Sequence, residues 1–464
     1  MSPFAPGNPI KRRALENVMM ASGVTAETRP WKRAAAWLAG LGILFFSSYN
    51  SANWLASQRA HVPAIVFSWE SWVPYWPWTI LPYWSIDLFY CVSLFMCATR
   101  RELDTHARRL LAVQVISVTL FIVAPLRYTF LRPETTGLFG AMLDALLLFD
   151  KPFNQAPALH ISLLIILWVC YTRYLKGFWR WMLHGWFLLI GMSVLSTYQH
   201  HFFDIPTGVW LGWFCVWLFP HDAMPLAGHW HRTHDAQRIK LAAIYLAGAL
   251  MLGTVAIVAS GWWLWLLWAA GSLMLVALAY AGLGIAVFQK GADGTMSLAS
   301  RWLLAPYLAG AWLNARWWTR HAAIATAVTP EIWLGRLPGR EHALPAGITT
   351  LIDLCAELPC QVSSLAPRYE SLPALDLIAL TTPQLEVLAQ AIDRNIVAGP
   401  VLVCCALGYS RSAAAVAGWL ITRGRAASAR EALAIIRLAR PQVVLTEQQC
   451  VALDNLARAT PMMR

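Results

Sequence analysis

Eight long runs of apolar residues, separated by polar loops, are the feature that most limits how this 464-residue chain can fold. Each run is close to the roughly 20 residues that an α-helix needs to cross a bilayer. The runs cover 34–56, 78–98, 110–126, 158–175, 180–197, 203–220, 241–260 and 262–285. A further run, 137–149, is too short to cross and is expected to be re-entrant or interfacial. The pattern predicts a membrane α-helical bundle with about eight transmembrane helices.

The composition excludes a single water-soluble globule. Hydrophobic residues make up 58% of the chain and charged residues only 13%, against roughly 25% charged in soluble domains. Many of the 26 Trp lie near the ends of apolar runs, as in the aromatic belts of membrane interfaces. In such a protein the net charge of +12 indicates loops held on one side of the membrane rather than binding to nucleic acid.

Positive charge alternates between the two sides of the predicted spans. The basic or His-rich segments are 1–33, 99–109, 173–180 and 221–240. The positive-inside rule therefore predicts that the N-terminus and everything after residue 285 are cytoplasmic, in an inner membrane crossed an even number of times. Four histidines of one basic loop are interpreted as solvated residues and not as a metal site: His221, His229, His231 and His234.

From about residue 325 the apolar runs shorten to strand length and alternate with amphipathic helices. Buried strands are predicted at 347–355 and 401–405, and helices at 382–397 and 412–423. Two capping boxes predict the starts of further helices, Ser428 with Glu431 and Thr446 with Gln449. This alternation indicates a small α/β domain over 325–464. The segment 286–324, rich in Trp and Arg, is expected to be a linker on the inner membrane surface.

A loop between the strand 401–405 and the following helix carries Cys405 and, six residues later, Arg411. A strand–loop–helix junction aims successive backbone N–H groups at one point and so can bind phosphate. Gly408 permits the tight turn. The pattern predicts that Arg411 binds two phosphate oxygens and that the Cys405 thiolate attacks phosphorus to form a phosphocysteine.

This loop, with the sequence CALGYSRS, resembles the signature of the protein tyrosine and dual-specificity phosphatase family. The resemblance covers about residues 328–458 and includes the segment Trp333–Arg336 and the pair Arg440–Pro441. It implies a cysteine-phosphatase fold for the C-terminal domain, with Cys405 as the nucleophile and Ser412 beside it. It also implies phosphate binding by Arg411 and by the loop residues Ala406, Leu407, Gly408, Tyr409 and Ser410.

The same resemblance implies a general acid on a loop about 30 residues before the cysteine, and Asp376 occupies that place. Asp353 and Asp393 fall in a predicted strand and a predicted helix and fit less well. The chain departs from the family at Cys404, where a histidine is usual. Two interpretations of Cys404 stay open, a small buried strand residue and a redox partner of Cys405.

Polar residues in three outward-facing loops form a second constellation, with Arg132–Pro133, then His160, then His200 and Asp204. Ionisable residues at the edge of a membrane span are costly and usually functional. Asp204, four residues after His200, can orient that imidazole as a nucleophile if the stretch is helical. His160 could protonate a leaving oxygen, and Arg132 could hold phosphate.

These fragments resemble the type 2 phosphatidic acid phosphatase superfamily over roughly residues 78–220, or six spans with the first included. The resemblance implies that His200 is a nucleophile, Asp204 its orienting carboxylate and His160 a general acid. The chain departs from the family where Pro125 and Val194 replace a Lys and an Arg. The neighbouring His201 is interpreted as a structural residue.

The whole chain is thus predicted to be a fusion of two phosphatase-like parts. Its predicted segments are a basic N-terminus (1–33), a phosphatidic acid phosphatase-like bundle (34–220), two more transmembrane helices (241–285), the linker (286–324) and the α/β domain (325–464). The predicted reaction is hydrolysis of phosphate monoesters without metal or cofactor. Tethering to a bilayer favours phospholipid head groups. The alternatives are a membrane-anchored phosphoprotein phosphatase, a head-group phosphotransferase in the bundle, and a weakly catalytic phosphate-binding sensor.

Overall fold

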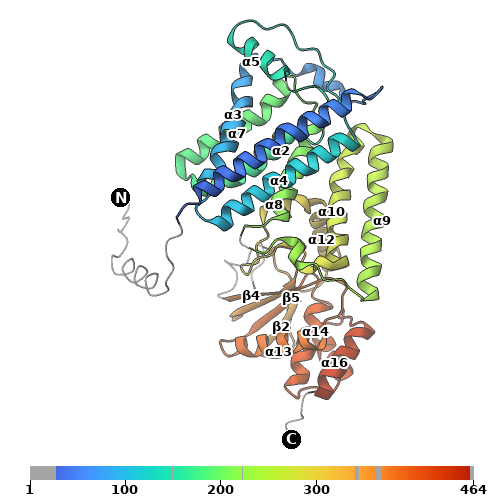
Figure 1. The fold of residues 1–464 in the computed structure, drawn as a ribbon. Coiled ribbons are helices and arrows are strands. Elements are labelled where there is room, and N and C mark those ends of the chain that lie inside the picture. Colours follow the sequence, from blue (N-terminus) through green and yellow to red (C-terminus); the bar gives the residue numbers. More distant parts are fainter. Residues whose placement is uncertain (1–27, 149, 222, 340–343, 361–367, 460–464) are drawn as a thin grey trace, which may run out of the picture. The chain divides into compact units, whose positions relative to one another are not determined.

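The computed structural model describes residues 28–148, 150–221, 223–339, 344–360 and 368–459, drawn as ribbon in Figure 1. These residues fall into two compact units, Met1–Ala223 and Met224–Arg464. Lys11, Arg12 and Arg13 of the predicted basic N-terminus lie outside the described residues.

The first unit is helical. Its helices are α2 (Trp31–Ser57), α3 (Ile80–Met96), α4 (Arg100–Val123), α5 (Gly137–Leu147), α6 (Leu159–Tyr174), α7 (Gly177–Ser196) and α8 (Asp204–Leu218). Each of the six spans predicted before residue 223 corresponds to one helix, and the short run 137–149 forms α5. Helices α6 and α8 approach closely at Gly208, where a Cβ atom would lie 2.7 Å from the Ala158 carbonyl oxygen. Small residues permit such packing between membrane helices.

Four helical segments among the described residues are long and apolar enough to cross a membrane. They are Pro77–Met96, Arg100–Val123, Ala236–Ala259 and Gly261–Phe288. The total of eight spans and their orientation stay predictions.

The second unit begins with a helical hairpin. Helix α9 (Ala236–Ala259) is followed by the 3₁₀ turn η4 (Gly261–Trp265), α10 (Leu266–Leu278) and the π-helical segment η5 (Ala279–Leu283). Helix α9 packs along α10. Two further helices, α11 (Leu298–Leu303) and α12 (Ala305–Trp318), occupy the predicted linker. Several Trp side chains of this stretch are exposed: Trp302, Trp312, Trp317 and Trp318.

A five-stranded sheet follows in the order β1-β2-β5-β3-β4. The strands are β1 (Ala325–Ala327), β2 (Ile332–Arg336), β3 (Thr350–Cys355), β4 (Arg368–Ala374) and β5 (Val401–Cys405). β2, β5, β3 and β4 are parallel, and only β1 is antiparallel. The α/β prediction is therefore confirmed, and β5 has the predicted bounds. The strand predicted from residue 347 begins at Thr350.

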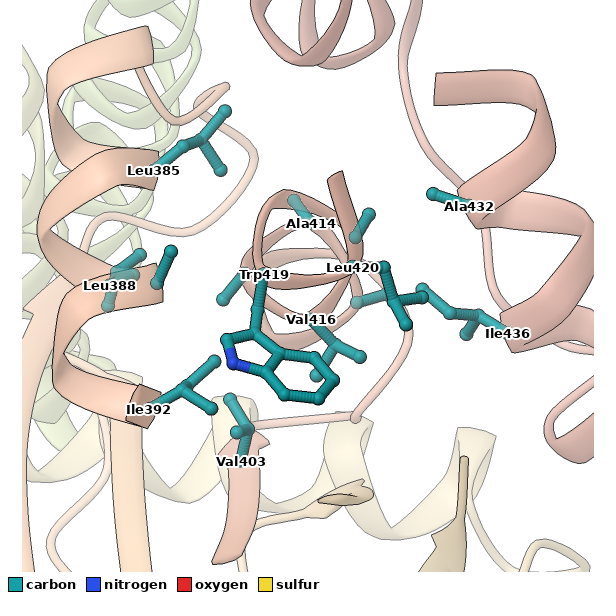
Figure 2. Packing of buried hydrophobic residues seen from close by; sticks show 14 of the residues in the cluster. Leu385, Leu388, Ile392, Val403, Ala414, Val416, Trp419, Leu420, Ala432 and Ile436 are labelled. Carbon is teal, nitrogen blue, oxygen red and sulfur yellow. The ribbon is translucent and has the colours of Figure 1, made fainter. Parts of the chain in front are cut away.

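Helix α14 (Arg411–Thr422) lies at the centre of the domain core. It is surrounded by α13 (Thr382–Ile396), α15 (Ala429–Ala439), α16 (Glu447–Ala459) and the sheet. Figure 2 shows Trp419 of α14 between side chains of α13 and Val403 of β5, with Ile436 of α15 beyond Leu420. Because α14 is buried on nearly every side, its N-terminus and Arg411 are held in a fixed position at the end of β5.

Candidate active site

The Cys405 thiol lies at the last residue of β5, where the chain turns into α14. Its Sγ lies 3.2 Å from Oγ of Ser412, and the backbone N–H of Gly408 donates to it at 3.3 Å. The side chains of Cys405 and Ser412 are both buried. One backbone donor and one hydroxyl group therefore face the same sulfur atom.

Three carbonyl groups of the loop are bound by neighbouring segments. The carbonyl of Cys405 accepts from Leu337 N–H, that of Leu407 from the Arg440 guanidinium, and that of Tyr409 from Val444 N–H. In a trans peptide the N–H points opposite to the C=O. The N–H groups of the residues that follow these carbonyls (Ala406, Gly408 and Ser410) therefore point away from the carbonyls' partners. The loop thus has the form of an anion-binding nest.

Gly408 is required by both conformation and space. Its φ of +74° is in the left-handed region, which side chains other than glycine rarely adopt. A Cβ atom there would lie 2.4 Å from the backbone carbonyl of Gly335 in β2. The segment Trp333–Arg336, noted in the sequence, is therefore the wall against which the loop packs.

Arg411 is buried and held by Glu357, which follows β3. Its two terminal nitrogens lie 2.8 and 2.5 Å from the two Glu357 carboxylate oxygens. Burial alone would raise the pKa of Glu357, but the charge and hydrogen bonds of Arg411 outweigh burial and lower it. The Arg411 Nε atom is buried and has no hydrogen-bond partner within the described part of the chain. The terminal nitrogens are engaged by Glu357 and the Ala374 carbonyl, so the sequence prediction of two N–H groups for phosphate is met here by one N–H that is unengaged among the described residues.

Sequence reasoning missed Glu357. The signal that could have found it is topological, because the carboxyl ends of adjacent parallel strands meet at one edge of a sheet. Glu357 lies just beyond β3, and Cys405 ends the neighbouring β5. A carboxylate at that edge is placed to meet the arginine of the loop.

Asp376, just after β4, lies at the same edge. Its Oδ1 atom is 2.9 Å from an Arg411 nitrogen, and Arg411 also donates to the Ala374 carbonyl at 2.8 Å. Burial, assisted by the nearby charge of Glu357, raises the pKa of Asp376 in spite of Arg411. A carboxyl group that keeps its proton more readily than usual is suited to donate it.

Asp353 and Asp393, which fit the general acid less well in the sequence, contact other groups in the structure. Asp353 is fully buried and accepts from Lys290 Nζ at 2.6 Å and from the Tyr369 hydroxyl at 2.7 Å. Asp393 accepts from the Trp419 indole and the Arg423 guanidinium, each at 2.7 Å. Both are engaged in contacts that hold elements together.

Cys404 and Cys405 belong to opposite faces of the sheet. Cys404 packs in the cluster that contains Cys355 and Cys360, whereas Cys405 belongs to the cluster around α14. Successive side chains of a strand alternate in this way. The arrangement favours Cys404 as a buried strand residue over a redox partner of Cys405.

The first unit brings three of its predicted site residues together. His200 Nδ1 lies 3.2 Å from Asp204 Oδ2, which also accepts the His201 N–H at 3.0 Å. His160 stacks on Tyr83 at 4.1 Å, and its Nε2 is buried with no hydrogen-bond partner among the described residues. His160 and His200 interact electrostatically. Asp150, which the sequence did not single out, also interacts with His200 and accepts from the Tyr49 hydroxyl.

His201 and Arg132 have other partners. The His201 ring lies 2.8 Å from Glu70 at Nδ1 and accepts the Thr129 N–H at Nε2, so both ring nitrogens are used. This favours the structural interpretation of His201. Arg132 pairs with Asp144 of α5. Val194 is buried in the helical core.

No family model matches the chain, and no curated protein matches it. Solved structures that match about 30% of the chain include a putative dual specificity phosphatase and a tyrosine phosphatase-like interacting protein. PTPMT1 in complex with PI(5)P is 18% identical, and the alignment covers 29% of this chain and 96% of that one, with a TM-score of 0.25. Human DUSP28 is 24% identical over 30% of this chain and 95% of its own, with a TM-score of 0.27. Tk-PTP in the active form is 23% identical over 30% and 99%, with a TM-score of 0.26.

Proposed function

We propose that the C-terminal domain hydrolyses phosphate monoesters through a phosphocysteine intermediate. The observation that carries this proposal is the contact set of Cys405 Sγ, which receives the Gly408 N–H and lies beside the Ser412 hydroxyl. This sulfur sits at the base of a loop with three carbonyls bound by neighbouring segments, next to a buried arginine.

The chemistry follows from these positions. The loop N–H groups and Arg411 bind the phosphate oxygens, and the Cys405 thiolate attacks phosphorus. The bond from phosphorus to the leaving oxygen breaks, and Asp376 donates its proton to that oxygen. Water then attacks the phosphocysteine, giving its proton to the Asp376 carboxylate, and the S–P bond breaks. Inorganic phosphate and the thiolate are released, and Asp376 is again protonated.

Phospholipid head-group phosphates are the proposed substrates. The Tyr280 hydroxyl donates to the Asp376 carbonyl, and its ring stacks on Tyr245 at 5.5 Å. Tyr245 lies nine residues into α9, which is about 13 Å along a helix of about 36 Å. The loop of Asp376 therefore lies beside the end of the hairpin predicted to be cytoplasmic. In the predicted topology this end of the hairpin faces the inner leaflet, and this supports a lipid over a soluble phosphoprotein as the substrate.

The test uses the full chain in vesicles of phosphatidylcholine that contain phosphatidic acid or a phosphatidylinositol monophosphate. Release of inorganic phosphate is measured for the native chain, for Cys405→Ser and for Cys404→Ala as the matched control. We expect Cys405→Ser to be inactive and Cys404→Ala to keep its activity, because only Cys405 faces the loop. A phosphotyrosyl peptide hydrolysed faster than every lipid would favour the protein phosphatase alternative. Phosphate binding without turnover would favour the sensor.

A second candidate function belongs to the first unit, as a lipid-phosphate phosphatase or phosphotransferase. The observation in its favour is the His200–Asp204 pair close to His160, whose buried Nε2 lacks a partner among the described residues. In this candidate function His200 attacks phosphorus and His160 protonates the leaving oxygen. Loss of lipid-phosphate turnover in His200→Ala, with Cys405 intact, is the expected result.

A further inference from the structure

The loop of Asp376 is held at two backbone points, and one of the donors comes from the membrane hairpin. Arg411 donates to the Ala374 carbonyl at 2.8 Å, and the Tyr280 hydroxyl donates to the Asp376 carbonyl at 3.0 Å. Tyr280 belongs to η5, which continues α10. A residue nearly one hundred positions earlier in the chain thus contacts the loop that carries the general acid.

The peptide group between Asp376 and Leu377 connects this contact to the acid itself. Its carbonyl accepts from Tyr280, and the carboxylate of Asp376 lies 2.9 Å from an Arg411 nitrogen. Rotation of this one peptide would break the bond from Tyr280 and shift the backbone that carries the carboxyl group. The orientation of the carboxyl group therefore depends on a bond that Tyr280 makes.

Leu377 shows that this peptide orientation needs support. Its φ is +58°, in the left-handed region, which a residue with a Cβ atom rarely adopts and only at a cost. The Leu377 side chain is 59% exposed, so its own packing does little to hold the backbone. The hydrogen bond from Tyr280 is placed to offset this cost.

Tyr280 is itself fixed by α9. Its side chain is buried, and its ring is nearly parallel to that of Tyr245, at 8°. Arg238, in the first turn of α9, donates to the Ala279 and Tyr280 carbonyls at 3.2 Å each. The hydroxyl therefore reaches Asp376 from a rigid support.

We propose that Tyr280 is a positioning residue for Asp376, so that acid catalysis in the C-terminal domain depends on the hairpin of α9 and α10. This inference rests on the proposed function, in which Asp376 protonates the leaving oxygen. It assigns to the hairpin a role in the chemistry beyond anchoring the domain.

The test compares two leaving groups in the full chain reconstituted in vesicles. An alkyl phosphate such as phosphatidic acid leaves as an alcohol and needs the acid, whereas 4-nitrophenyl phosphate leaves as a stable phenolate and needs it little. For Tyr280→Phe we expect kcat on the lipid to fall about tenfold, a fraction of the 10²–10⁴ that a general acid contributes. On the aryl ester kcat should stay within about twofold, and KM for both should be unchanged.

Tyr245→Phe is the matched control, since it keeps the ring stack and removes a hydroxyl that hydrogen-bonds with Tyr307 and reaches Asp376 only electrostatically. It should leave both substrates unaffected. An equal loss on both substrates in Tyr280→Phe, or no loss on either, would overturn the inference.

Leu377→Gly gives a second measurement. Glycine adopts a positive φ without the cost that leucine carries, so adding Leu377→Gly to Tyr280→Phe should recover part of the lipid activity. No recovery would overturn the peptide-orientation argument.

Asp376→Asn separates this inference from the proposed function. If Asp376→Asn shows no preference between the two leaving groups, the assignment of the acid fails, whatever Tyr280→Phe does.

Discussion

Glu357 is the single residue that best tests how Arg411 is held. The charge of Arg411 lowers the pKa of Glu357 against the effect of burial. The ion pair therefore stabilises the fold above the ordinary glutamate value of 4.5, and this stabilisation is lost as the pH falls through the lowered pKa. Glu357→Gln should reduce the free energy of unfolding by about 3 kcal/mol at pH 7, because the buried Arg411 charge loses the closer of its two carboxylate partners. Urea unfolding at pH 7 and pH 3 checks this. An equal loss at both pH values would contradict the ion pair.

Asp376 supplies a prediction about activity and pH. Because burial raises its pKa, the acid keeps its proton above the ordinary aspartate value of 3.8. On a lipid substrate kcat should fall only as the pH rises through that raised value. Asp376→Asn should remove this limb of the pH–rate profile and lower kcat about 10²–10⁴-fold. Asp393→Asn, whose carboxylate contacts Trp419 and Arg423, should keep the limb.

Among the structural elements, the turn from β5 into α14 tolerates the least change. Gly408→Ala would place a methyl group 2.4 Å from the Gly335 carbonyl and force a left-handed backbone on alanine. We expect Gly408→Ala to lose turnover and to lose the stabilisation against unfolding that bound inorganic phosphate gives. The backbone conformation alone should destabilise the variant by more than about 1 kcal/mol. Gly418→Ala in α14 is the control, because its Cβ would meet only ordinary contacts at 3.5 Å. Wild-type activity in Gly408→Ala would contradict the fit of the loop against β2.

The elements also show which features a sequence can reveal. β5 and the capped helices were predictable because their signals are local, as at Ser428, whose side chain accepts the Glu431 N–H. Cys405 and Arg411 were predictable because six positions hold them in one loop. Glu357 and Tyr280 carry no such pattern, since their roles depend on the sheet order and on a contact from the hairpin. Asp376 could be placed only through resemblance to a family.

For the whole molecule, the predicted topology puts the two candidate sites on opposite sides of the membrane. A reporter fused after Arg464, which lies outside the described residues, should be cytoplasmic, and one inserted near Thr136 should be periplasmic. In sealed inside-out vesicles, Cys405→Ser should abolish hydrolysis of phosphate esters added outside. His200→Ala should leave that activity intact and remove turnover of lipid phosphate on the luminal face. Loss of the external activity in His200→Ala would mean that the topology is wrong or that the sites are coupled.

The contacts of Lys290 limit where the chain can be truncated without loss of the fold of the α/β domain. Its ammonium group is buried and bonded to the Asp353 carboxylate and to the carbonyls of Cys355 and Leu358, on either side of Glu357. A fragment that starts at residue 325, where the sequence pattern changes, would leave Asp353 as a buried charge without its cation. The α/β domain is therefore not expected to fold by itself from residue 325, and fusing it to another anchor would require the stretch from before Lys290. Because of the same ion pair, a gene fusion or truncation that transfers the α/β domain would also have to include the end of the hairpin.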